Sequence, residues 1–348
     1  MKKILCALGA LLLLCGCGAQ EKPAEVQFFA MDTVMTVTVY GKQAEQAARA
    51  VQAELNRLDR LWSRTRPDSD ISKINDCAGD GTQVAVSPDT AELLTTALEI
   101  MGESGGAFNP MLAPVMDAWG FTKQEHRVPT QKELDGLLAL TRDPPAVTCG
   151  KGFENATVCL PLEGQKLDLG GIAKGLATAI ASRTAESYEI DGLLLDLGGN
   201  LHTQGSKPGG APWRVGVKDP QNTQEILCTF LLDGRTCATS GGYERYFEAD
   251  GRTYHHIIDP STGYPADGDL LSVTVVGDPA WADAWSTAFF VLGSEQALEL
   301  WRGAAGPVGE ADLILVTREG HVYATQGLEE GFDFRGEENG YTYEIVSR

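Results

Sequence analysis

The sequence predicts a fold of the α+β or mixed α/β class, in which packed helices cover one mixed sheet. Segments of alternating β-branched and aromatic residues are interspersed with segments whose apolar residues recur every three or four positions. Some of these segments have the spacing of a parallel crossover, and others have that of an antiparallel hairpin. No low-complexity linker divides residues 26–348, which we therefore expect to form a single unit.

The composition is that of an acidic globular protein. Hydrophobic residues make up 43% of the 348 positions, too many for intrinsic disorder, and the 40 glycines follow no fixed period. The chain has 28 Lys and Arg against 48 Asp and Glu, a formal net charge of −20. Nucleic-acid binding needs a basic surface that displaces counterions, so we expect no nucleic-acid partner.

The N-terminal segment is expected to direct export. The apolar run Ile4–Leu14 follows two lysines and is too short to span a bilayer, as in a signal peptide. A sequence that resembles a bacterial lipobox ends at Cys17. We therefore expect residues 1–16 to be removed as the signal peptide and Cys17 to be acylated. Residues 17–25 would then form a tether to the extracytoplasmic face of the cell membrane. An ordinary secretory signal cleaved nearby is the alternative.

The remaining cysteines show no pattern of a metal site. They include no Cys-x-x-Cys pair and have no histidine at ligand spacing. Cys149 and Cys159 could form a disulfide across a hairpin, but the odd number leaves at least one thiol unpaired. We expect unpaired, buried thiols. The five residues are Cys77, Cys149, Cys159, Cys228 and Cys237.

The pattern of roughly the first 140 residues predicts one strand and three helices. Residues 27–40 alternate as a strand does, and residues 43–62 carry the apolar stripe of a surface helix. Ser87 and a following proline predict the start of a helix that reaches residue 101. Thr130 and Glu133 have the spacing of a capping box ahead of another short helix.

The middle of the chain predicts a strand, a helix and a second strand. Residues 166–169 and 192–197 read as extended, and residues 172–188 read as helical. Such a unit usually forms a right-handed parallel crossover. The later strand signals are 243–249 and 252–258, joined by the tight-turn dipeptide Asp250-Gly251, and then 271–276, 313–317 and 321–325.

The helix that begins at Asp278-Pro279 and ends at Leu292 contains a single charge. It is apolar nearly all round, which predicts burial. Asp283 is the charge, and Thr287 lies one turn later on the same side. A buried carboxylate is costly unless it is paired or bound to metal, so Asp283 needs a cation. The two side chains offer oxygen ligands that suit Mg²⁺. The alternative is that Asp283 pairs with a buried Arg or Lys.

Two further patterns suggest anion binding and proton transfer. The segment Asp168–Gly175 places two glycines and Lys174 at the expected start of a helix, where the backbone amides favour an anion. A turn that serves only close packing is the alternative. His256 stands at the end of a predicted strand and could act as a general base if it faces a cleft. A histidine satisfied within the hairpin is the alternative.

Taken in order along the chain, these patterns resemble the ApbE family, the FAD:protein FMN transferases. The resemblance covers roughly residues 28–295. The segments that carry it are Met31-Asp32-Thr33, Gly106–Pro110, Trp119-Gly120-Phe121, Asp168–Gly175, Gly198-Gly199-Asn200, Pro212–Gly216, Thr239-Ser240-Gly241, His256–Gly263 and Ala282–Ala288.

The resemblance implies an enzyme. Residues 26–348 would form one catalytic unit, an ApbE-like flavin transferase domain with a T-fold-related fold. The enzyme would bind FAD with Mg²⁺, move the FMN half onto a hydroxyl of an acceptor protein, usually a threonine, and release AMP. The acceptor would be an exported protein of an electron-transfer system.

The resemblance also implies roles for individual residues. The expected metal ligands are Asp283, Thr287 and the backbone carbonyl of Gly171. His256 matches the candidate base of the family. The two expected catalytic residues are therefore His256 and Asp283. The positions that match FAD contacts are Met31, Ala107, Phe108, Asn109, Asp168, Lys174, His256 and Ile257.

Two positions depart from the family pattern. Asn109 stands where many members have Asp, which removes a carboxylate from the flavin site. In the loop between Ser63 and Ser69, where members can carry an aromatic residue, this chain has Arg64 and Arg66. Either arginine could replace the aromatic ring by a cation–π contact with the flavin.

Three functions stay open at this point. The first is FMN transfer to a protein. The second is an FAD pyrophosphatase that uses the same site and gives FMN and AMP, because the nucleophile comes from outside the chain. The third is a lipoprotein that binds flavin without catalysis.

Overall fold

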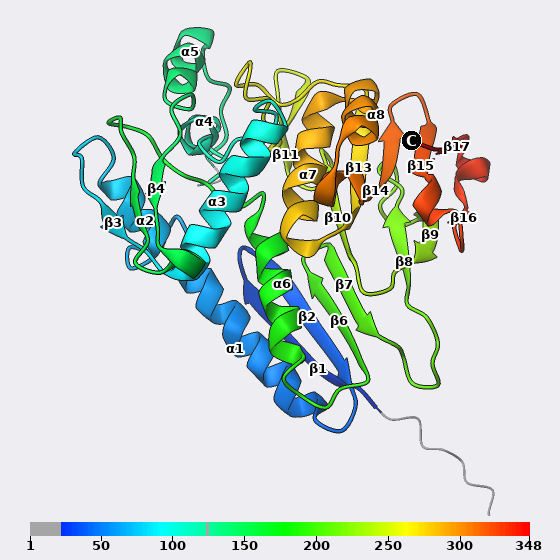
Figure 1. Ribbon diagram of the computed structural model, residues 1–348. Coiled ribbons are helices and arrows are strands. Elements are labelled where there is room, and N and C mark those ends of the chain that lie inside the picture. The colour runs from blue at the N-terminus through cyan, green and yellow to red at the C-terminus, as the bar shows by residue number, and fades with distance from the viewer. Residues whose placement is uncertain (1–21, 123–124) are drawn as a thin grey trace, which may run out of the picture.

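The computed structural model describes residues 22–122 and 125–348 (Figure 1). The expected signal peptide, the expected acylation site Cys17 and the first residues of the tether lie outside the described residues. The first strand, β1, begins at Ala24, two residues before the expected boundary at 26. No helix in the described ranges is long and apolar enough to cross a membrane.

A nine-stranded sheet runs through the molecule (Figure 1). Neighbouring strands are antiparallel except β15 and β17 at one edge, which are parallel, so the mixed sheet and the mixed fold class are confirmed. In order across the sheet, the strands are β1 (Ala24–Ala30), β2 (Thr33–Tyr40), β6 (Gly192–Leu197), β7 (Asn200–Gly205), β10 (Thr236–Gly241), β13 (Leu270–Gly277), β14 (Asp312–Thr317), β15 (His321–Thr325) and β17 (Thr342–Val346).

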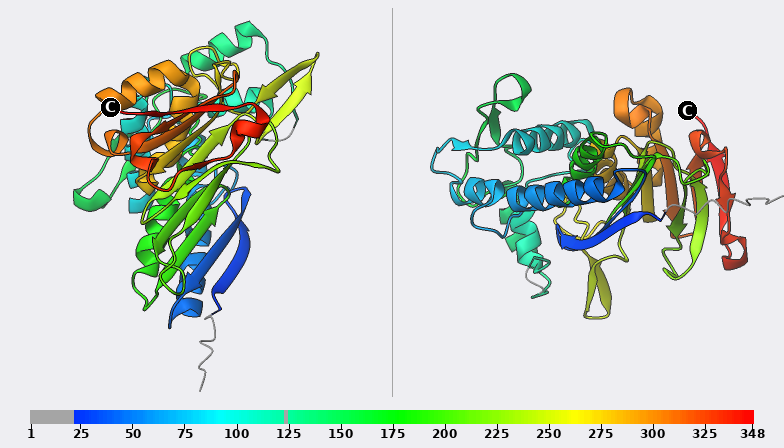
Figure 2. Two further views of the ribbon diagram at one scale, coloured as in Figure 1. Left: turned by 90° about the vertical axis from the view of Figure 1, so that its right-hand side faces the viewer. Right: turned by 90° about the horizontal axis from the view of Figure 1, so that it is seen from below.

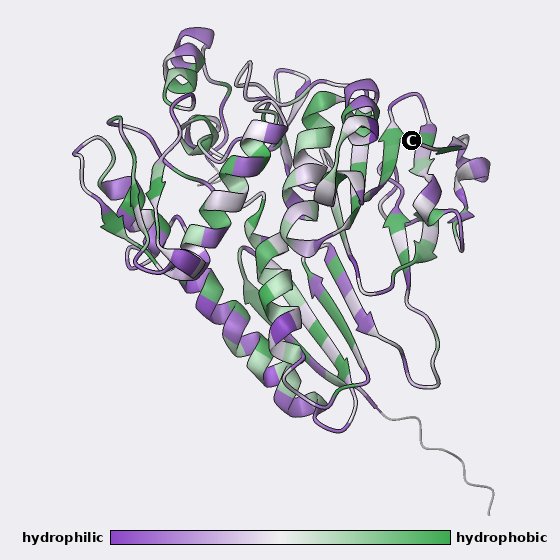
Figure 3. Cartoon of the chain, in the orientation of Figure 1, coloured by the Kyte–Doolittle hydropathy of each residue, from purple (hydrophilic) through white to green (hydrophobic). Residues whose placement is uncertain are grey.

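Helices pack on one face of this sheet. α1 lies against β1 and β2, and α7 lies against β10 and β13, with α6 packed between α1 and α7 (Figure 1). Hydrophilic and hydrophobic residues alternate along α1, as expected for a helix with one face in solvent (Figure 3). The main helices are α1 (Ala44–Trp62), α3 (Pro88–Glu103), α6 (Ala173–Ala185), α7 (Pro279–Leu292) and α8 (Ser294–Gly303).

A second layer covers the other face at the C-terminal end of the sheet. The small sheet formed by β8 (Arg214–Lys218), β9 (Ile226–Leu231) and β16 (Asp333–Phe334) packs there around Phe230, Ile314 and Val316. The hairpin of β11 (Tyr246–Ala249) and β12 (Arg252–His255) projects from the body (Figure 2). The other short elements are α2 (Asp70–Asp76), β3 (Val84–Ala85), α4 (Ala113–Trp119), α5 (Gln131–Ala139), β4 (Ala146–Thr148), β5 (Thr157–Cys159) and α9 (Gly306–Gly309).

The predicted helix starts are confirmed, together with their caps. The Ser87 side chain accepts the Thr90 N–H at the start of α3. The Thr130 side chain accepts the Glu133 N–H at the start of α5, and Asp278 caps α7. These caps lie within four residues of the groups that they satisfy, which is why the sequence shows them.

The single strand expected over residues 27–40 is wrong. The chain reverses at Met31 and Asp32, and β1 and β2 pair as a hairpin on either side. Both turn residues have positive φ, 48° and 58°, as a two-residue primed turn requires. The usual sequence signal for such a hairpin turn is Asn-Gly or Asp-Gly. The Met-Asp pair at this turn lacks that signal.

The expected parallel crossover is also wrong. Residues 166–169 join no strand, and β6 pairs antiparallel with both β2 and β7. The Leu167 N–H donates to Asn75 Oδ1 at 2.7 Å, and Asn75 Nδ2 donates to the Leu167 carbonyl at 3.1 Å. A side chain from α2 therefore satisfies backbone groups that a neighbouring strand would otherwise bind.

The five cysteines in the described ranges are unpaired. The register of β4 and β5 places Cys159 opposite Ala146, so Cys149 is not its cross-strand partner and the disulfide does not form. The expectation of burial holds for Cys228 and Cys237, whereas Cys149 is exposed.

Candidate functional site

Asp283 lies inside the protein beside the start of α6. Only 5% of the residue is exposed. The Lys174 Nζ atom lies 3.3 and 3.4 Å from the two carboxylate oxygens, and the Gly175 N–H donates to Oδ2 at 3.2 Å. A Cβ atom at Gly175 would lie 2.5 Å from the Pro279 carbonyl oxygen, so only glycine allows α6 this close to α7. Lys174 is thus the cation beside Asp283. This is the alternative given above, in which Asp283 pairs with a basic side chain.

Thr287 and Gly171 adjoin this pair. The Thr287 hydroxyl lies 3.2 Å from the Ser240 hydroxyl at the end of β10 and is half-buried. A Cβ atom at Gly171 would lie 3.9 Å from Thr287 Oγ1 and 3.2 Å from the Phe108 ring. The structure therefore brings Asp283, Thr287 and Gly171 to one place, as predicted.

The start of α6 is suited to an anion. The Ala173 N–H donates to the Leu169 carbonyl at 2.8 Å, and the Gly175 N–H donates to Asp283 Oδ2. The Lys174 side chain, 22% exposed, adds a positive charge at the same end. The positive end of the helix dipole and this lysine together favour a phosphate group.

The oxygen donors are of the type that Mg²⁺ accepts. A carboxylate, a hydroxyl and a backbone carbonyl are hard ligands, and few of them come from protein when phosphate supplies the rest. The contacts of 3.3 and 3.4 Å between Lys174 Nζ and the Asp283 oxygens are longer than a typical charge-assisted hydrogen bond, and each carboxylate oxygen has lone pairs for more than one partner. No group of three or more His, Cys, Asp or Glu side chains that could hold a metal occurs in the described ranges.

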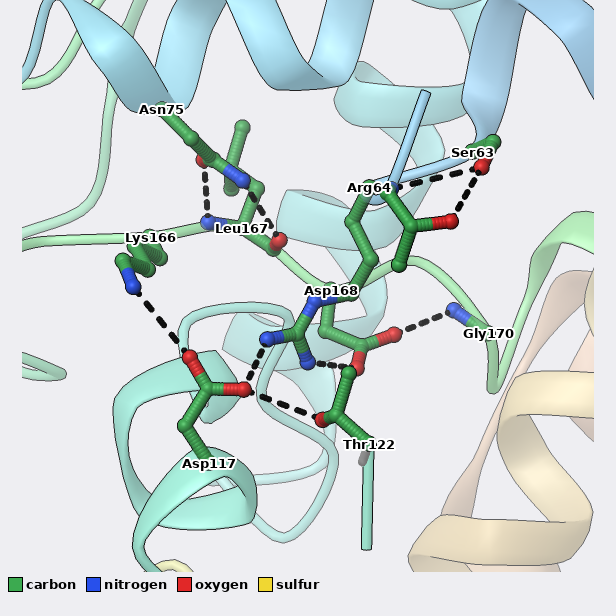
Figure 4. Close-up of polar contacts among 10 residues, drawn as sticks. Ser63, Arg64, Asn75, Asp117, Thr122, Lys166, Leu167, Asp168 and Gly170 are labelled. Carbon is green, nitrogen blue, oxygen red and sulfur yellow. Dashed lines mark hydrogen bonds and ion pairs between the residues drawn. The ribbon is translucent and has the colours of Figure 1, made fainter. Parts of the chain in front are cut away.

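Asp168 shapes the glycine turn that precedes α6. Its Oδ1 atom accepts the Gly170 N–H at 2.9 Å, and its Oδ2 atom accepts Arg64 Nη1 at 2.7 Å (Figure 4). Arg64 also donates to Asp117 on α4, and its side chain is only 15% exposed. Arg64 is thus held in a double ion pair, whereas the Arg66 side chain is 44% exposed, and a cation–π contact of either arginine with the flavin stays a prediction.

The loop before α4 contributes an apolar wall. Ala107 and Phe108 are buried, and the Phe108 ring faces Gly171. Both the nitrogen and the oxygen of the Asn109 side-chain amide bind backbone groups. The amide donates to the Thr141 carbonyl at 3.2 Å and accepts the Met111 N–H at 2.8 Å. A carboxylate could not donate to Thr141, so this departure from the family pattern gives the loop an additional hydrogen bond.

Met31 is held in an unusual conformation. Its φ of 48° is uncommon for a residue other than glycine, and its N–H donates to Asp59 Oδ1 at 2.8 Å. Arg245, at the base of the β11–β12 hairpin, donates to the Asp32 carbonyl at 3.4 Å. Strained backbone of this kind is concentrated at functional sites. The contact brings the β1–β2 turn to the segment that carries His256.

His256 is neutral and oriented by the backbone. Its Nδ1 atom lies 3.2 Å from the Arg245 carbonyl oxygen, which can only accept, so Nδ1 carries the proton and Nε2 has the lone pair. Burial lowers the pKa of His256 to about 4, and the positive charges of Arg245 and Lys174 act in the same direction. At neutral pH the imidazole is therefore in the form of a base.

Ile257 is buried beside His256, and its expected contact with FAD stays a prediction. Its side chain is 5% exposed and belongs to the main core, and its carbonyl accepts the Ala266 N–H at 2.9 Å. Three other residues contact these site residues and were assigned no role from the sequence. Ser240 lies in one of the segments that carry the family resemblance, whereas no local pattern marks Asp59 and Arg245.

Comparisons with known proteins find related sequences. The family model described as the ApbE family matches residues 31–308. An FAD:protein FMN transferase from Treponema pallidum is 34% identical, with 93% of this chain and 92% of the relative aligned. An FAD:protein FMN transferase from Escherichia coli K12 is 30% identical, with 91% and 93% aligned.

Solved structures share the fold. The crystal structure of the ApbE protein from Thermotoga maritima has a TM-score of 0.79 and 32% identity and covers 89% of this chain and 99% of its own. The apo flavinyl transferase ApbE from Pseudomonas stutzeri has a TM-score of 0.74 and 29% identity, covering 89% and 97%. On the family match, the sequence identity and the shared fold, this chain belongs to the ApbE family.

Proposed function

We propose that the protein transfers the FMN half of FAD to a threonine or serine hydroxyl of an acceptor protein and releases AMP, with Mg²⁺ as its cofactor. The observation that carries the proposal is the meeting of Asp283, Thr287 and Gly171 at the start of α6. Oxygen ligands for a cation and positive groups for a diphosphate thus occupy one place. The names of the relatives and the solved flavinyl transferase support a transferase.

Mg²⁺ would be held by the Asp283 carboxylate, the Thr287 hydroxyl and the Gly171 carbonyl. When bound there, the ion would neutralise charge on the diphosphate and act as a Lewis acid. Lys174 adds a positive charge from the protein itself. An overall acidic chain can still bind FAD, because these groups act at contact distance whereas distant surface charges are screened over about 8–10 Å.

We assign the proton transfer to His256. The hydroxyl oxygen of the acceptor attacks the phosphorus of the FMN half, and the bond from that phosphorus to the oxygen retained by AMP breaks. The hydroxyl proton passes to Nε2 of His256, which is unprotonated at neutral pH because Nδ1 binds the Arg245 carbonyl. The new phosphoester bond joins FMN to the acceptor, and AMP leaves.

The proposed setting is the outer face of a bacterial cell membrane, with the chain anchored by a lipid on Cys17. The lipobox-like sequence that ends at Cys17 supports this. The acceptor is then an exported protein of an electron-transfer system. Candidates are exported proteins of the same genome that carry a threonine in a short flavin-acceptor motif.

The test is a mass measurement on the acceptor. The protein is incubated with FAD, Mg²⁺ and a purified candidate acceptor, and we expect the acceptor to gain the mass of FMN while AMP appears in equal amount. Replacing the acceptor threonine by alanine should remove the adduct. AMP release without acceptor at the same rate would favour a pyrophosphatase, and flavin binding without any AMP would favour a binding lipoprotein.

The matched variants are Asp283→Ala and Asp267→Ala. Asp283 is buried at the site, whereas the Asp267 side chain is 97% exposed. We expect the first substitution to abolish adduct formation and the second to leave it unchanged. Full activity of Asp283→Ala would contradict the assignment of Asp283.

A further inference from the structure

Arg64 joins three segments that are far apart in sequence. It lies in the loop after α1 and binds Asp117 on α4 and Asp168 in the glycine turn (Figure 4). The Arg64 to Asp168 contact is 2.7 Å, and Lys166 also reaches Asp117 at 3.2 Å. Thr122 donates to the same Asp117 carboxylate at 3.0 Å. The cluster thus has two acidic and two basic side chains.

Arg64 binds Asp168, which lies in a segment without secondary structure. Residues 166–169 belong to no strand, so side chains fix their course. Asn75 binds both backbone groups of Leu167, and the Asp168 N–H donates to the Pro110 carbonyl at 2.8 Å. Arg64 is the contact that orients the Asp168 carboxylate, whose other oxygen accepts the Gly170 N–H.

The orientation of Asp168 matters for the residues that follow. Gly170 leads directly to Gly171 beside Thr287, and Lys174 begins the first turn of α6. Without Arg64, the carboxylates of Asp117 and Asp168 would keep only the more exposed Lys166 as a counter-charge among the residues that the structure describes. Their negative charge would then act on a diphosphate bound at the start of α6. The turn would also lose the contact that fixes it.

We propose that Arg64 is a positioning residue for nucleotide binding, which acts through Asp168 to set the glycine turn and to offset its negative charge. The inference rests on the proposed function, because it takes the ligand at the start of α6 to be the FAD diphosphate. In this role Arg64 acts through Asp168 and not by contact with the nucleotide. Its loss should therefore weaken FAD binding, while Asp283 and His256, which do not contact Arg64, stay in place.

The experiment compares Arg64→Gln with Arg57→Gln. Arg57 is a matched control on α1, where it forms a similar double ion pair with Glu54 and Asp89 away from the site. Flavin fluorescence gives the Kd for FAD in the presence of Mg²⁺, and AMP release with saturating acceptor gives KM and kcat. We expect Arg64→Gln to raise Kd and KM for FAD about tenfold or more and to lower kcat less than about threefold. Arg57→Gln should change each value less than about twofold.

A merely structural role gives a different pattern. It would lower the melting temperature and the active fraction, and hence kcat, but would leave KM for FAD unchanged. An unchanged Kd and KM in folded Arg64→Gln, or an equal change in Arg57→Gln, would overturn the proposal. If Arg64→Gln does not fold, Asp117→Asn removes only one partner of Arg64 and is expected to raise KM about threefold. No change in KM for that variant would also overturn it.

A double-mutant cycle tests the route through Asp168. If Arg64 acts through that carboxylate, Arg64→Gln combined with Asp168→Asn should raise Kd no more than the larger single change. Multiplied effects would show that the two residues act separately and would overturn the proposed route. A wild-type protein that binds FAD but forms no FMN adduct would instead contradict the proposed function, and the Kd comparison would still stand.

Discussion

Lys174 at the start of α6 lies 3.3 Å from the buried carboxylate of Asp283 on α7. The contact joins the two helices at the point where the glycine turn, the end of β10 and α7 meet. It explains how a charge inside an apolar helix is tolerated, since a buried carboxylate without a partner is strongly destabilising. We infer that the same carboxylate serves Mg²⁺ binding.

Substitution of Lys174 should couple stability to Mg²⁺. Lys174→Gln removes the cation beside Asp283, and we expect the free energy of unfolding to fall by about 1–3 kcal/mol. Added Mg²⁺ should then raise the melting temperature of this variant more than that of the wild type, because it can replace the missing charge. Lys166→Gln is the control, since Lys166 pairs with Asp117 nearer the surface. Equal Mg²⁺ responses in all three proteins would contradict the shared use of Asp283.

Replacing His256 should slow the transfer by removing the general base. Loss of a general base typically lowers the rate about 10²–10⁴-fold, so we expect His256→Gln to reduce kcat by at least about a hundredfold. His321→Gln on β15 is the control. The pKa of about 4 means that the wild type keeps a neutral base down to acidic pH, so the rate should fall as pH drops through about 4. A fall of the rate near pH 6.5 in the pH–rate profile would show that burial does not lower the pKa of His256.

A different histidine should govern stability in acid. His202 is 5% exposed, and its ring nitrogens lie 3.0 Å from the hydroxyls of Ser182 and Thr236. Burial lowers its pKa to about 4, below the value of about 6.5 in the unfolded chain, so the unfolded state binds the proton first. The stability contribution is complete above about pH 6.5 and is lost as pH falls towards 4.

The measurement is urea unfolding of wild type and His202→Gln across that pH range. We expect the wild type to lose on the order of 3 kcal/mol more than the variant, because only the wild type has this group to protonate. Parallel losses in the two proteins would assign the acid sensitivity to other groups.

The turn at Met31 and Asp32 allows backbone strain and side-chain function to be separated. Both residues have positive φ, which costs a residue other than glycine about 1–2 kcal/mol. Asp32→Gly should therefore stabilise the protein with no effect on FAD binding. Met31→Gly should relieve the same strain but raise the Kd for FAD, because it removes a side chain that is expected to contact FAD. Equal Kd values for the two variants would contradict a binding role for Met31.

The sequence revealed those features that depend on neighbouring residues. The caps at Ser87, Thr130 and Asp278 lie beside the helices they begin, and the burial of Asp283 followed from a single charge in an apolar helix. The hairpin turn at Asp250-Gly251 was equally local, and both residues have positive φ.

Other features depend on contacts between distant segments. Asn75 replaces a strand partner for Leu167, 92 residues later, and no local pattern could show this. The pairing of Lys174 with Asp283 spans 109 residues, so the sequence indicated that Asp283 needed a cation but not which one. The sequence did not show the ion pairs of Arg64, because its two acidic partners come from other segments.

Calorimetric titration with Mg²⁺ in the presence of FAD, comparing the wild type with Asp283→Asn, tests the central claim most directly. Asn keeps the size of the side chain but removes its charge. We predict that the wild type binds one Mg²⁺ and that Asp283→Asn, still folded, binds it at least about a hundredfold more weakly. Equal Mg²⁺ affinity in the two proteins would contradict the claim that this buried carboxylate holds the catalytic ion.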